Sequence, residues 1–589
     1  METQISMNRL LWITLMVIGL FGCSEEQSSS EFINPYVKFK DATANVSYVS
    51  GKLTTTVVWA NTLWEIVTEK DQGWVTGISL TLGGGLEAGE NATEVVFTYK
   101  ENLSEERRKQ DFFVVNLSTQ EKTKFTIIQG ADNASVIQLT PSDKYQTVEG
   151  IGGGIANYEQ WYCQHPNKKE LFDLVFKDLE ISMIRIGNWY EKKVSNENPD
   201  ILKQQKEIMD AATQRLGRRN FSVMMSNWLV TPDLIDRPKE KGATLKRNNE
   251  GNYMYKEFGE WCRMTLKAYQ EADMAPDYLS MMNEPDGDNS AGTKICLGYG
   301  TDDSKKANYG KALEATYEAL KDVSNRPKLI GPEVLGIGYG TFSNYYRDLN
   351  PDLLDAAAFH CYHGGNTSDY KDNDRYSSAH AFKTEFQNLA RQVGNKSIMM
   401  TENCSYHPTV PADAVNIAHF ISNSFRYANA TVYLHWALLW GYADADELKK
   451  GGDGCIAVEW PWSSSRWTTE KGYVVRSEFY GLKHFTKYVK PGWRRIGVDY
   501  ELKEVEAVAF QDPDEYQITV VLINYSDQEE KTVRLKNPDG KEVSSIRKVI
   551  QTDTPKESWY QELKGIDPFV ELLLPKMSVT TVYFKFKTN

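Results

Sequence analysis

The feature that most limits how this chain can fold is an alternation of short apolar runs with amphipathic stretches, from about residue 136 to residue 490. Eight runs have the length and composition of buried strands: 148–155, 183–187, 221–226, 278–282, 329–331, 356–359, 397–401 and 431–438. The stretches between them have the apolar spacing of helices, among them 168–179, 201–216, 257–271, 304–323 and 412–427. Eight such units predict a parallel (β/α)8 barrel over 136–490 rather than a doubly wound sheet.

The segments on both sides of this range lack helical periodicity. Residues 33–131 contain short alternating runs separated by glycine-rich turns, which predicts a small all-β module. Residues 491–589 contain short strand-like runs separated by turns such as Asn537-Pro538-Asp539-Gly540, which predicts a β-sandwich packed on the barrel. The chain is therefore expected to be multidomain, with one α/β part and two all-β parts.

The first 32 residues have the pattern of an export signal followed by a tether. Arg9 precedes an apolar run, 10–21, that is too short to span a bilayer. The run leads into Cys23 through a sequence that resembles a bacterial lipobox, so residues 1–22 are expected to be a lipoprotein signal peptide and Cys23 the lipidated residue. Residues 23–32 form a flexible tether whose acidic start resembles the surface-export signal of Bacteroidetes lipoproteins. This predicts a lipid-anchored protein on the outer membrane; an uncleaved anchor or an ordinary secretory signal is the alternative.

Composition excludes some functions. The net charge is −13, from 67 Lys plus Arg against 80 Asp plus Glu, and no basic run forms a patch, so nucleic acid is not an expected partner. Aromatic residues reach 12%, which is typical of proteins that stack sugars on flat rings, although large cores use them too. The six cysteines after Cys23 include no C-x-x-C pair, and the glycines at 152–154 lack the lysine of a P-loop. We therefore expect no metal and no cofactor, and cysteine pairing stays open.

Two glutamates directly follow strand-like runs, Glu284 after the fourth and Glu402 after the seventh. The carboxyl ends of all strands meet at one face of a parallel barrel, so these carboxylates are expected to face each other across its mouth. Glycoside cleavage needs such a pair: a neutral carboxyl protonates the leaving oxygen, and an ionised one attacks the sugar or activates water. A purely structural role for both is the alternative. Glu149 and Glu333 lack a matching motif context and are expected to take no part.

Residues from about Gln146 to Phe586 resemble glycoside hydrolase family 30. The resemblance is carried by the glycine-rich stretch 148–154, by 280–286 around Asn283-Glu284-Pro285, by 400–403, and by Lys490-Pro491-Gly492 at the entry to the last sandwich. It implies retention of anomeric configuration, with Glu402 as nucleophile and Glu284 as acid and base. Retention requires carboxylates about 5–5.5 Å apart.

The segment 33–131 contains Trp64-Glu65-Ile66, Trp74-Val75, a turn at 100–102, Arg107-Arg108 and a closing run at 127–130. By these features it resembles a BACON domain, an immunoglobulin-like β-sandwich common in Bacteroidetes lipoproteins. One interpretation is a carbohydrate-binding module with Trp59, Trp64 or Trp74 as its platform. We favour a spacer with these rings in the core, because sandwiches normally bury such a tryptophan.

Other side chains at predicted strand ends are expected to line the sugar-binding groove. Arg185 is expected either to hold Glu402 ionised or to form a structural ion pair, and Asn283 to bind the sugar 2-hydroxyl. Tyr362 is expected to hydrogen-bond the nucleophile, and His360 either contacts sugar or is a buried supporting group. The aromatic and amide candidates are Asn227 and Trp228 as a subsite wall, Trp436 as the platform under the cleaved sugar, and Trp440.

The resemblance leaves the polysaccharide open, because the family includes xylanases, β-1,6-glucanases and exo-acting glucosidases. A surface lipoprotein favours an endo-acting enzyme, so we expect an endo-β-1,4-xylanase acting on xylan or glucuronoxylan. Family xylanases that grip a glucuronate branch use Arg and Tyr after the eighth strand; this chain offers Lys449, Lys450, Arg466 and Tyr473 there, which puts glucuronate dependence in doubt. A β-1,6-glucanase or a β-glucosidase is the alternative within the family, and a non-catalytic surface glycan-binding lipoprotein is the alternative outside it. A monomer is the default expectation.

Overall fold

The computed structural model of the chain describes residues 34–86, 89–104, 106–130, 134–238, 240–287, 295–302, 305–362, 382–404, 413–442, 454–536 and 543–586. The expected signal peptide, Cys23 and the tether lie outside these residues. The chain divides into two compact units, 1–129 and 130–589, which are described separately. No helix in the described part has both the length and the apolar character needed to cross a membrane.

The first unit is a β-sandwich of two sheets. One sheet has the order β1 (Tyr36–Phe39), β3 (Gly51–Ala60), β7 (Asn91–Tyr99), β5 (Val75–Ile78), and the other β2 (Thr43–Val46), β9 (Lys122–Gln129), β8 (Arg108–Asn116), β4 (Thr62–Val67), β6 (Leu82–Gly85). The core between them includes Phe97 and Phe112, whose ring centroids are 4.7 Å apart. Trp59, Trp64 and Trp74 are all buried in this core, so the interpretation of these rings as an exposed sugar platform is wrong.

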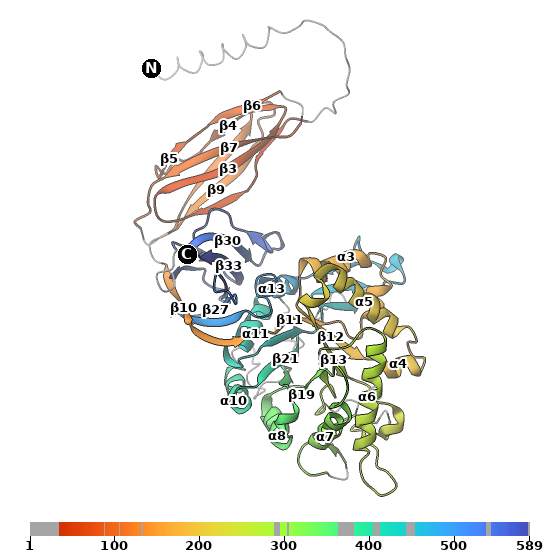
Figure 1. Cartoon of the computed structure of the whole chain (residues 1–589). Coiled ribbons are helices and arrows are strands. Elements are labelled where there is room, and N and C mark those ends of the chain that lie inside the picture. The colour runs from red at the N-terminus through yellow and green to blue at the C-terminus, as the bar shows by residue number, and fades with distance from the viewer. Residues whose placement is uncertain are drawn as a thin grey trace, which may run out of the picture. The chain divides into compact units, whose positions relative to one another are not determined.

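The second unit contains a closed barrel of eight parallel strands, as the sequence predicts (Figure 1). Its strands are β11 (Gly150–Gly154), β12 (Met183–Asn188), β13 (Ser222–Asn227), β16 (Tyr278–Ser280), β19 (Lys328–Val334), β20 (Ala356–His360), β21 (Ser397–Asn403) and β22 (Val432–His435). Buried side chains such as Met183, Met224, Met399 and Leu434 form a core cluster, so the barrel is packed rather than hollow.

Amphipathic helices surround the barrel and bury their apolar faces against it (Figure 1). The helices are α2 (Glu159–Cys163), α3 (Lys168–Phe172), continued by a π-helix (Asp173–Asp178), α4 (Tyr190–Val194), α5 (Ile201–Leu216), α6 (Tyr255–Glu271), α7 (Tyr309–Leu320), α8 (Thr341–Asp348), α10 (Lys383–Val393), α11 (Ala414–Tyr427) and α13 (Ser477–Thr486). The connections between barrel strands and helices also contain short strands: β14 (Ile235–Asp236), β15 (Thr244–Leu245), β17 (Leu297–Gly298), β18 (Ala307–Asn308), β23 (Leu439–Tyr442), β24 (Ile456–Glu459) and β25 (Tyr473–Val475).

The glycines of the first barrel strand are needed for close packing rather than for phosphate binding. A Cβ atom on Gly152 would lie 1.9 Å from the carbonyl oxygen of Met183 on the neighbouring strand. A Cβ on Gly154 would lie 2.7 Å from the indole ring of Trp436. Any larger residue at Gly154 would therefore displace the aromatic side chain at the end of β22.

The C-terminal part is a nine-stranded sheet that encloses a core of its own. Its order is β31 (Gln561–Glu562), β30 (Val543–Thr552), β33 (Ser578–Phe586), β28 (Gln517–Asn524), β27 (Val505–Gln511), β26 (Arg494–Asp499), β10 (Ser135–Thr147), β29 (Lys531–Lys536), β32 (Leu572–Leu574). Apolar residues such as Phe510 and Val579 also share the core of the barrel helices, so this sheet packs on the barrel.

Strand β10 joins this sheet before the barrel begins, antiparallel to β26 and parallel to β29. The range 136–490 expected for the barrel thus includes a strand of the C-terminal sheet. None of the strands predicted from the sequence lies at 135–147, and alternation alone does not show which sheet such a strand enters.

All six cysteines after Cys23 are buried, and none of them forms a disulfide in the described part of the chain.

Candidate active site

The acidic and basic candidates lie at the carboxyl ends of five barrel strands. Arg185 is in β12, Glu333 in β19 and His360 is the last residue of β20. Glu402 is in β21, and Glu284 lies four residues beyond the end of β16. Because the strands are parallel, all five side chains reach the same end of the barrel, which is where active sites of this fold form.

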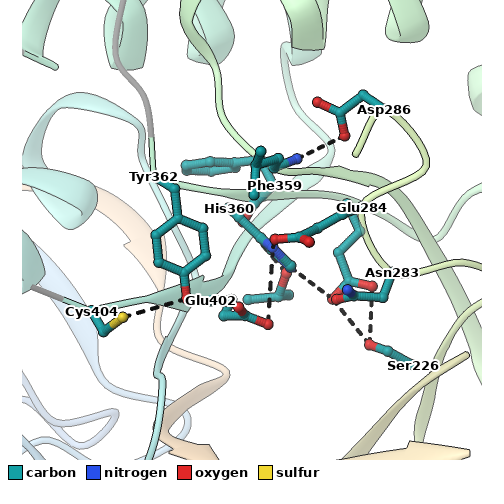
Figure 2. A network of polar contacts seen from close by, with 12 residues as sticks. Ser226, Asn283, Glu284, Asp286, Phe359, His360, Tyr362, Glu402 and Cys404 are labelled. Carbon is teal, nitrogen blue, oxygen red and sulfur yellow. Dashed lines mark hydrogen bonds and ion pairs between the residues drawn. The ribbon is translucent and has the colours of Figure 1, made fainter. Parts of the chain in front are cut away.

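The carboxyl groups of Glu284 and Glu402 lie close together beside His360 (Figure 2), with Glu284 Oε1 and Glu402 Oε2 3.1 and 3.9 Å from the same ring nitrogen, Nδ1. One oxygen of each carboxyl group and a ring nitrogen of His360 all lie within 4.8 Å of one another. The side chains of Glu284 and Glu402 are 14% and 9% exposed, so both can be reached by a ligand. This separation corresponds to the short spacing of retaining glycosidases, since inverting enzymes leave about 6.5–9.5 Å for a water molecule.

Two donors hold the carboxylate of Glu402. Arg185 donates from Nη1 to Glu402 Oε2, and the Tyr362 hydroxyl donates to Glu402 Oε1 over 2.7 Å. Burial raises the pKa of Tyr362 well above its ordinary value, so this phenol stays protonated and remains a donor. The thiol of Cys404 in turn donates to the Tyr362 oxygen over 3.6 Å (Figure 2). The contact expected between Arg185 and Glu402 is therefore present, and both donors favour the anion that a nucleophile must be.

Glu333 is fully buried at the centre of the site, although the sequence analysis expects it to take no part. It accepts hydrogen bonds from Arg185 Nη2 over 2.9 Å and from the Ser226 hydroxyl over 3.0 Å, and it lies 3.3 Å from His360 Nε2. Burial alone raises the pKa of Glu333, but the positive charge of Arg185 and the contact with His360 outweigh it and lower the pKa to about 2. Glu333 is thus a permanent anion, and the expectation of an uninvolved carboxyl group is wrong.

His360 is also fully buried, which fits the second of its two interpretations, a supporting group rather than a sugar contact. Its Nδ1 lies 3.1 Å from Glu284 Oε1, and its Nε2 faces Glu333. Burial alone lowers the pKa of His360, but Glu402, Glu284 and Glu333 raise it to about 9. Two buried cations, Arg185 and His360, therefore lie among the carboxyl groups of Glu284, Glu333 and Glu402. The contact with His360 also fixes the position of the Glu284 carboxyl group.

The backbone also fixes the position of Glu284. Both Glu284 and Glu333 have positive φ values, 45° and 55°, in a region that non-glycine residues rarely adopt. The Glu284 N–H donates to the Glu333 carbonyl oxygen over 3.0 Å. This bond connects the loop after β16 to the end of β19, so the backbone of Glu284 is held by the neighbouring strand.

Aromatic rings line one side of the site. The Arg185 guanidinium carbon lies 4.3 Å from the centroid of Trp228, and the rings of Trp228 and Trp436 are 6.0 Å apart. Trp436 follows β22 and covers Gly154. Trp440 lies further along in β23, with its ring 5.4 Å from that of Tyr158.

Two amides predicted to contact sugar are mostly enclosed. Asn227 is fully buried, and its Nδ2 donates to the Met281 carbonyl oxygen while its Oδ1 accepts from Asn188. Its placement in a subsite wall is therefore wrong: Ser226 contacts Glu333 inside the barrel, so the next residue in the strand points outward. Asn283 is 2% exposed and accepts a bond from Arg185 Nη2 over 2.6 Å. Its contact with a sugar hydroxyl stays a prediction.

The Glu284, His360 and Glu402 trio has the donor types of a metal site. However, Arg185 and the protonated ring of His360 already contact the same carboxylates, and their positive charges oppose a bound cation. We therefore keep the prediction of no metal. Lys449 and Lys450, considered for binding an anionic branch, lie outside the described residues.

Replacing Glu333 with Gln is expected to destabilise the second unit, because Arg185 and His360 would keep their buried charges without this anion. Removing one partner of a buried ion pair costs about 3–5 kcal/mol. The matched control is Glu149→Gln. The Glu149 carboxylate accepts hydrogen bonds from the hydroxyls of Tyr278 and Ser397, and such bonds contribute about 1 kcal/mol each. Denaturant unfolding of the full chain measures both losses. Equal losses in the two variants would contradict the ionic role of Glu333.

No family profile matches the sequence, and no curated protein sequence does either. Solved structures match the fold. The catalytic domain of GH30 xylanase C from Talaromyces cellulolyticus has a TM-score of 0.57 at 14% identity, covering 77% of this chain and 100% of that domain. A conserved exported protein from Bacteroides fragilis has a TM-score of 0.58 at 18% identity, covering 76% and 100%. An endo-β1,6-glucanase has a TM-score of 0.54 at 17% identity, covering 82% and 100%. At these identities the likeness establishes the fold.

Proposed function

We propose that the chain is a retaining glycoside hydrolase that cleaves a β-linked polysaccharide by double displacement. The observation that carries this is the pair Glu284 and Glu402, held within 4.8 Å by different supporting groups. Arg185 and Tyr362 bind Glu402 as an anion, and His360 orients Glu284. The fold shared with xylanase C and with the endo-β1,6-glucanase supports the same reaction class.

In the first step, a carboxylate oxygen of Glu402 attacks the anomeric carbon as the bond from that carbon to the glycosidic oxygen breaks. Glu284 gives its proton to the leaving oxygen. In the second step, Glu284 takes a proton from water, the water oxygen bonds to the anomeric carbon, and Glu402 is released. Two inversions at one carbon restore the starting configuration. Arg185 and Tyr362 set the direction of attack, and the Trp436 ring gives the sugar a flat apolar surface.

For the substrate we favour xylan or glucuronoxylan, cleaved within the chain by endo-β-1,4-xylanase action. A β-1,6-glucan or a β-glucoside is the second candidate, because an endo-β1,6-glucanase shares this fold with the same coverage of its own chain. We further propose that the protein is a monomer attached to the outer membrane through a lipid on Cys23.

The full chain is to be incubated with glucuronoxylan, unbranched xylan, β-1,6-glucan and aryl β-glycosides. New reducing ends and a first-formed β-anomer in proton NMR are the expected results. If the α-anomer forms first, the enzyme inverts the anomeric configuration, which contradicts double displacement. No reducing ends from any substrate would favour the alternative of a non-catalytic glycan-binding lipoprotein.

A further inference from the structure

Three tryptophans gather at the carboxyl ends of the first and eighth barrel strands. We call Trp161, Trp460 and Trp462 the tryptophan cluster; their ring centroids lie 5.5, 5.1 and 4.7 Å apart. Trp161 is in α2, which follows β11. Trp460 and Trp462 follow β24, which pairs with β23 just beyond the end of β22. The cluster therefore belongs to the same end of the barrel as Glu284 and Glu402.

The cluster is held rigidly by its surroundings. The Trp161 ring covers Gly441, where a Cβ atom would lie 2.4 Å from the indole. The Arg466 guanidinium lies 4.9 Å from the Trp460 centroid, and Trp467 Nε1 donates to the Trp460 carbonyl oxygen over 2.9 Å. These contacts fix the rings before any ligand arrives, which lowers the entropy cost of binding.

Trp462 is 41% exposed, and no other tryptophan in the described residues is as exposed. The ring planes of Trp161 and Trp460 make angles of 74° and 58° with the ring plane of Trp462, so both rings pack against it. A partly exposed indole supported in this way presents a flat apolar face to solvent.

Further aromatic rings follow the same two barrel strands. Trp436 follows β22 and is near Trp228 and Arg185. Trp440 comes next in β23, beside Tyr158, and Gly441 beneath Trp161 follows it directly. Aromatic side chains from the segments after strands one and eight thus contact each other and the backbone beside the tryptophan cluster.

We propose that the tryptophan cluster is a subsite for a sugar ring of the polysaccharide main chain, away from the bond that is cleaved, with Trp462 as the stacking surface. The C–H face of a β-linked pyranose is apolar and flat, and an indole of this kind matches it in size and polarity. The choice of a sugar polymer as ligand rests on the proposed function. Such a subsite favours long substrates over short ones.

The test measures binding to full-length chain that carries Glu402→Ala, so that polymer is not consumed. Soluble xylan and β-1,6-glucan are the probes, in affinity electrophoresis, with calorimetry for xylo- and β-1,6-gluco-oligosaccharides of increasing length. Adding Trp462→Ala is expected to weaken binding of the recognised polymer about five- to tenfold, the effect of losing one aromatic contact. Affinity should then stop rising with oligosaccharide length. Trp462→Phe should restore most of the loss.

Trp559→Ala is the matched control, because it removes one tryptophan from the C-terminal part, where that ring lies 5.7 Å from Tyr480. It should bind like the parent. The inference is overturned if Trp462→Ala binds like the parent, if both variants lose affinity equally, or if the parent binds neither polymer. Because binding is measured without hydrolysis, a wild type that cleaves nothing but shows Trp462-dependent binding would reject the proposed function and keep the subsite.

Discussion

Glu402→Ala should abolish release of new reducing ends from the polymer, with a loss of about 10⁴-fold or more, because no covalent intermediate can form. The side chain is only 9% exposed, and its removal leaves a small space beside the anomeric carbon of a bound sugar. Polymer binding should survive, since the aromatic wall formed by Trp228 and Trp436 is unchanged.

A small anion offers a stringent check of this prediction. Azide can enter the space left by Glu402 and attack the anomeric carbon of an activated aryl glycoside. One displacement then occurs instead of two, so the expected product is the α-glycosyl azide, the inverted anomer of a β-glycoside. NMR identifies the anomer. If azide gives a β-azide or no rescue at all, the assignment of Glu402 as nucleophile is in error.

Glu284→Gln should reduce polymer cleavage by about 10²–10⁴-fold, because the amide cannot protonate the leaving oxygen. The loss should depend on the leaving group. A dinitrophenolate departs without a proton, so formation of the glycosyl-enzyme from that substrate should be nearly normal in a pre-steady-state burst. The next step, which needs a base to activate water, should then be slow.

The two steps are separated by stopped-flow detection of the released phenolate. A burst followed by slow turnover is the expected trace for Glu284→Gln. Glutamine is the suitable substitution, because its amide oxygen can accept the same hydrogen bond from His360 Nδ1 as Glu284 Oε1. An equal loss with good and poor leaving groups would mean that Glu284 is not the acid. The Glu149→Gln variant serves as control, since that carboxyl group binds the hydroxyls of Tyr278 and Ser397.

The sequence alone identifies the barrel because its strand–helix period repeats eight times, and all eight predicted strands overlap strands of the structure. It also identifies Glu284 and Glu402, because a residue that follows a barrel strand must reach the same face. Glu333 lies two residues beyond the fifth predicted strand and satisfies the same rule. Its role depends on Arg185 and His360, which are distant in sequence and close only in the fold, so its sequence context does not show that role.

Other failures come from side-chain direction and strand pairing. Asn227 and Ser226 are adjacent, so one must point into the barrel and the other outward, and the sequence does not say which register applies. Strand β10 has the alternation of any half-buried strand, and nothing within it specifies β26 and β29 as partners. Both are consequences of contacts between residues far apart in the chain.

The position of β10 ties the two ends of the second unit together. Strand β10 precedes the barrel in the sequence, but both of its neighbours in the sheet, β26 and β29, are synthesised after the barrel. The sheet therefore cannot close until the ribosome has nearly finished the protein, and contacts of such long sequence separation make folding slow. Cutting the chain before β11 or after β22 would therefore separate β10 from its neighbours in the sheet, so the barrel and the C-terminal sheet form one structural unit.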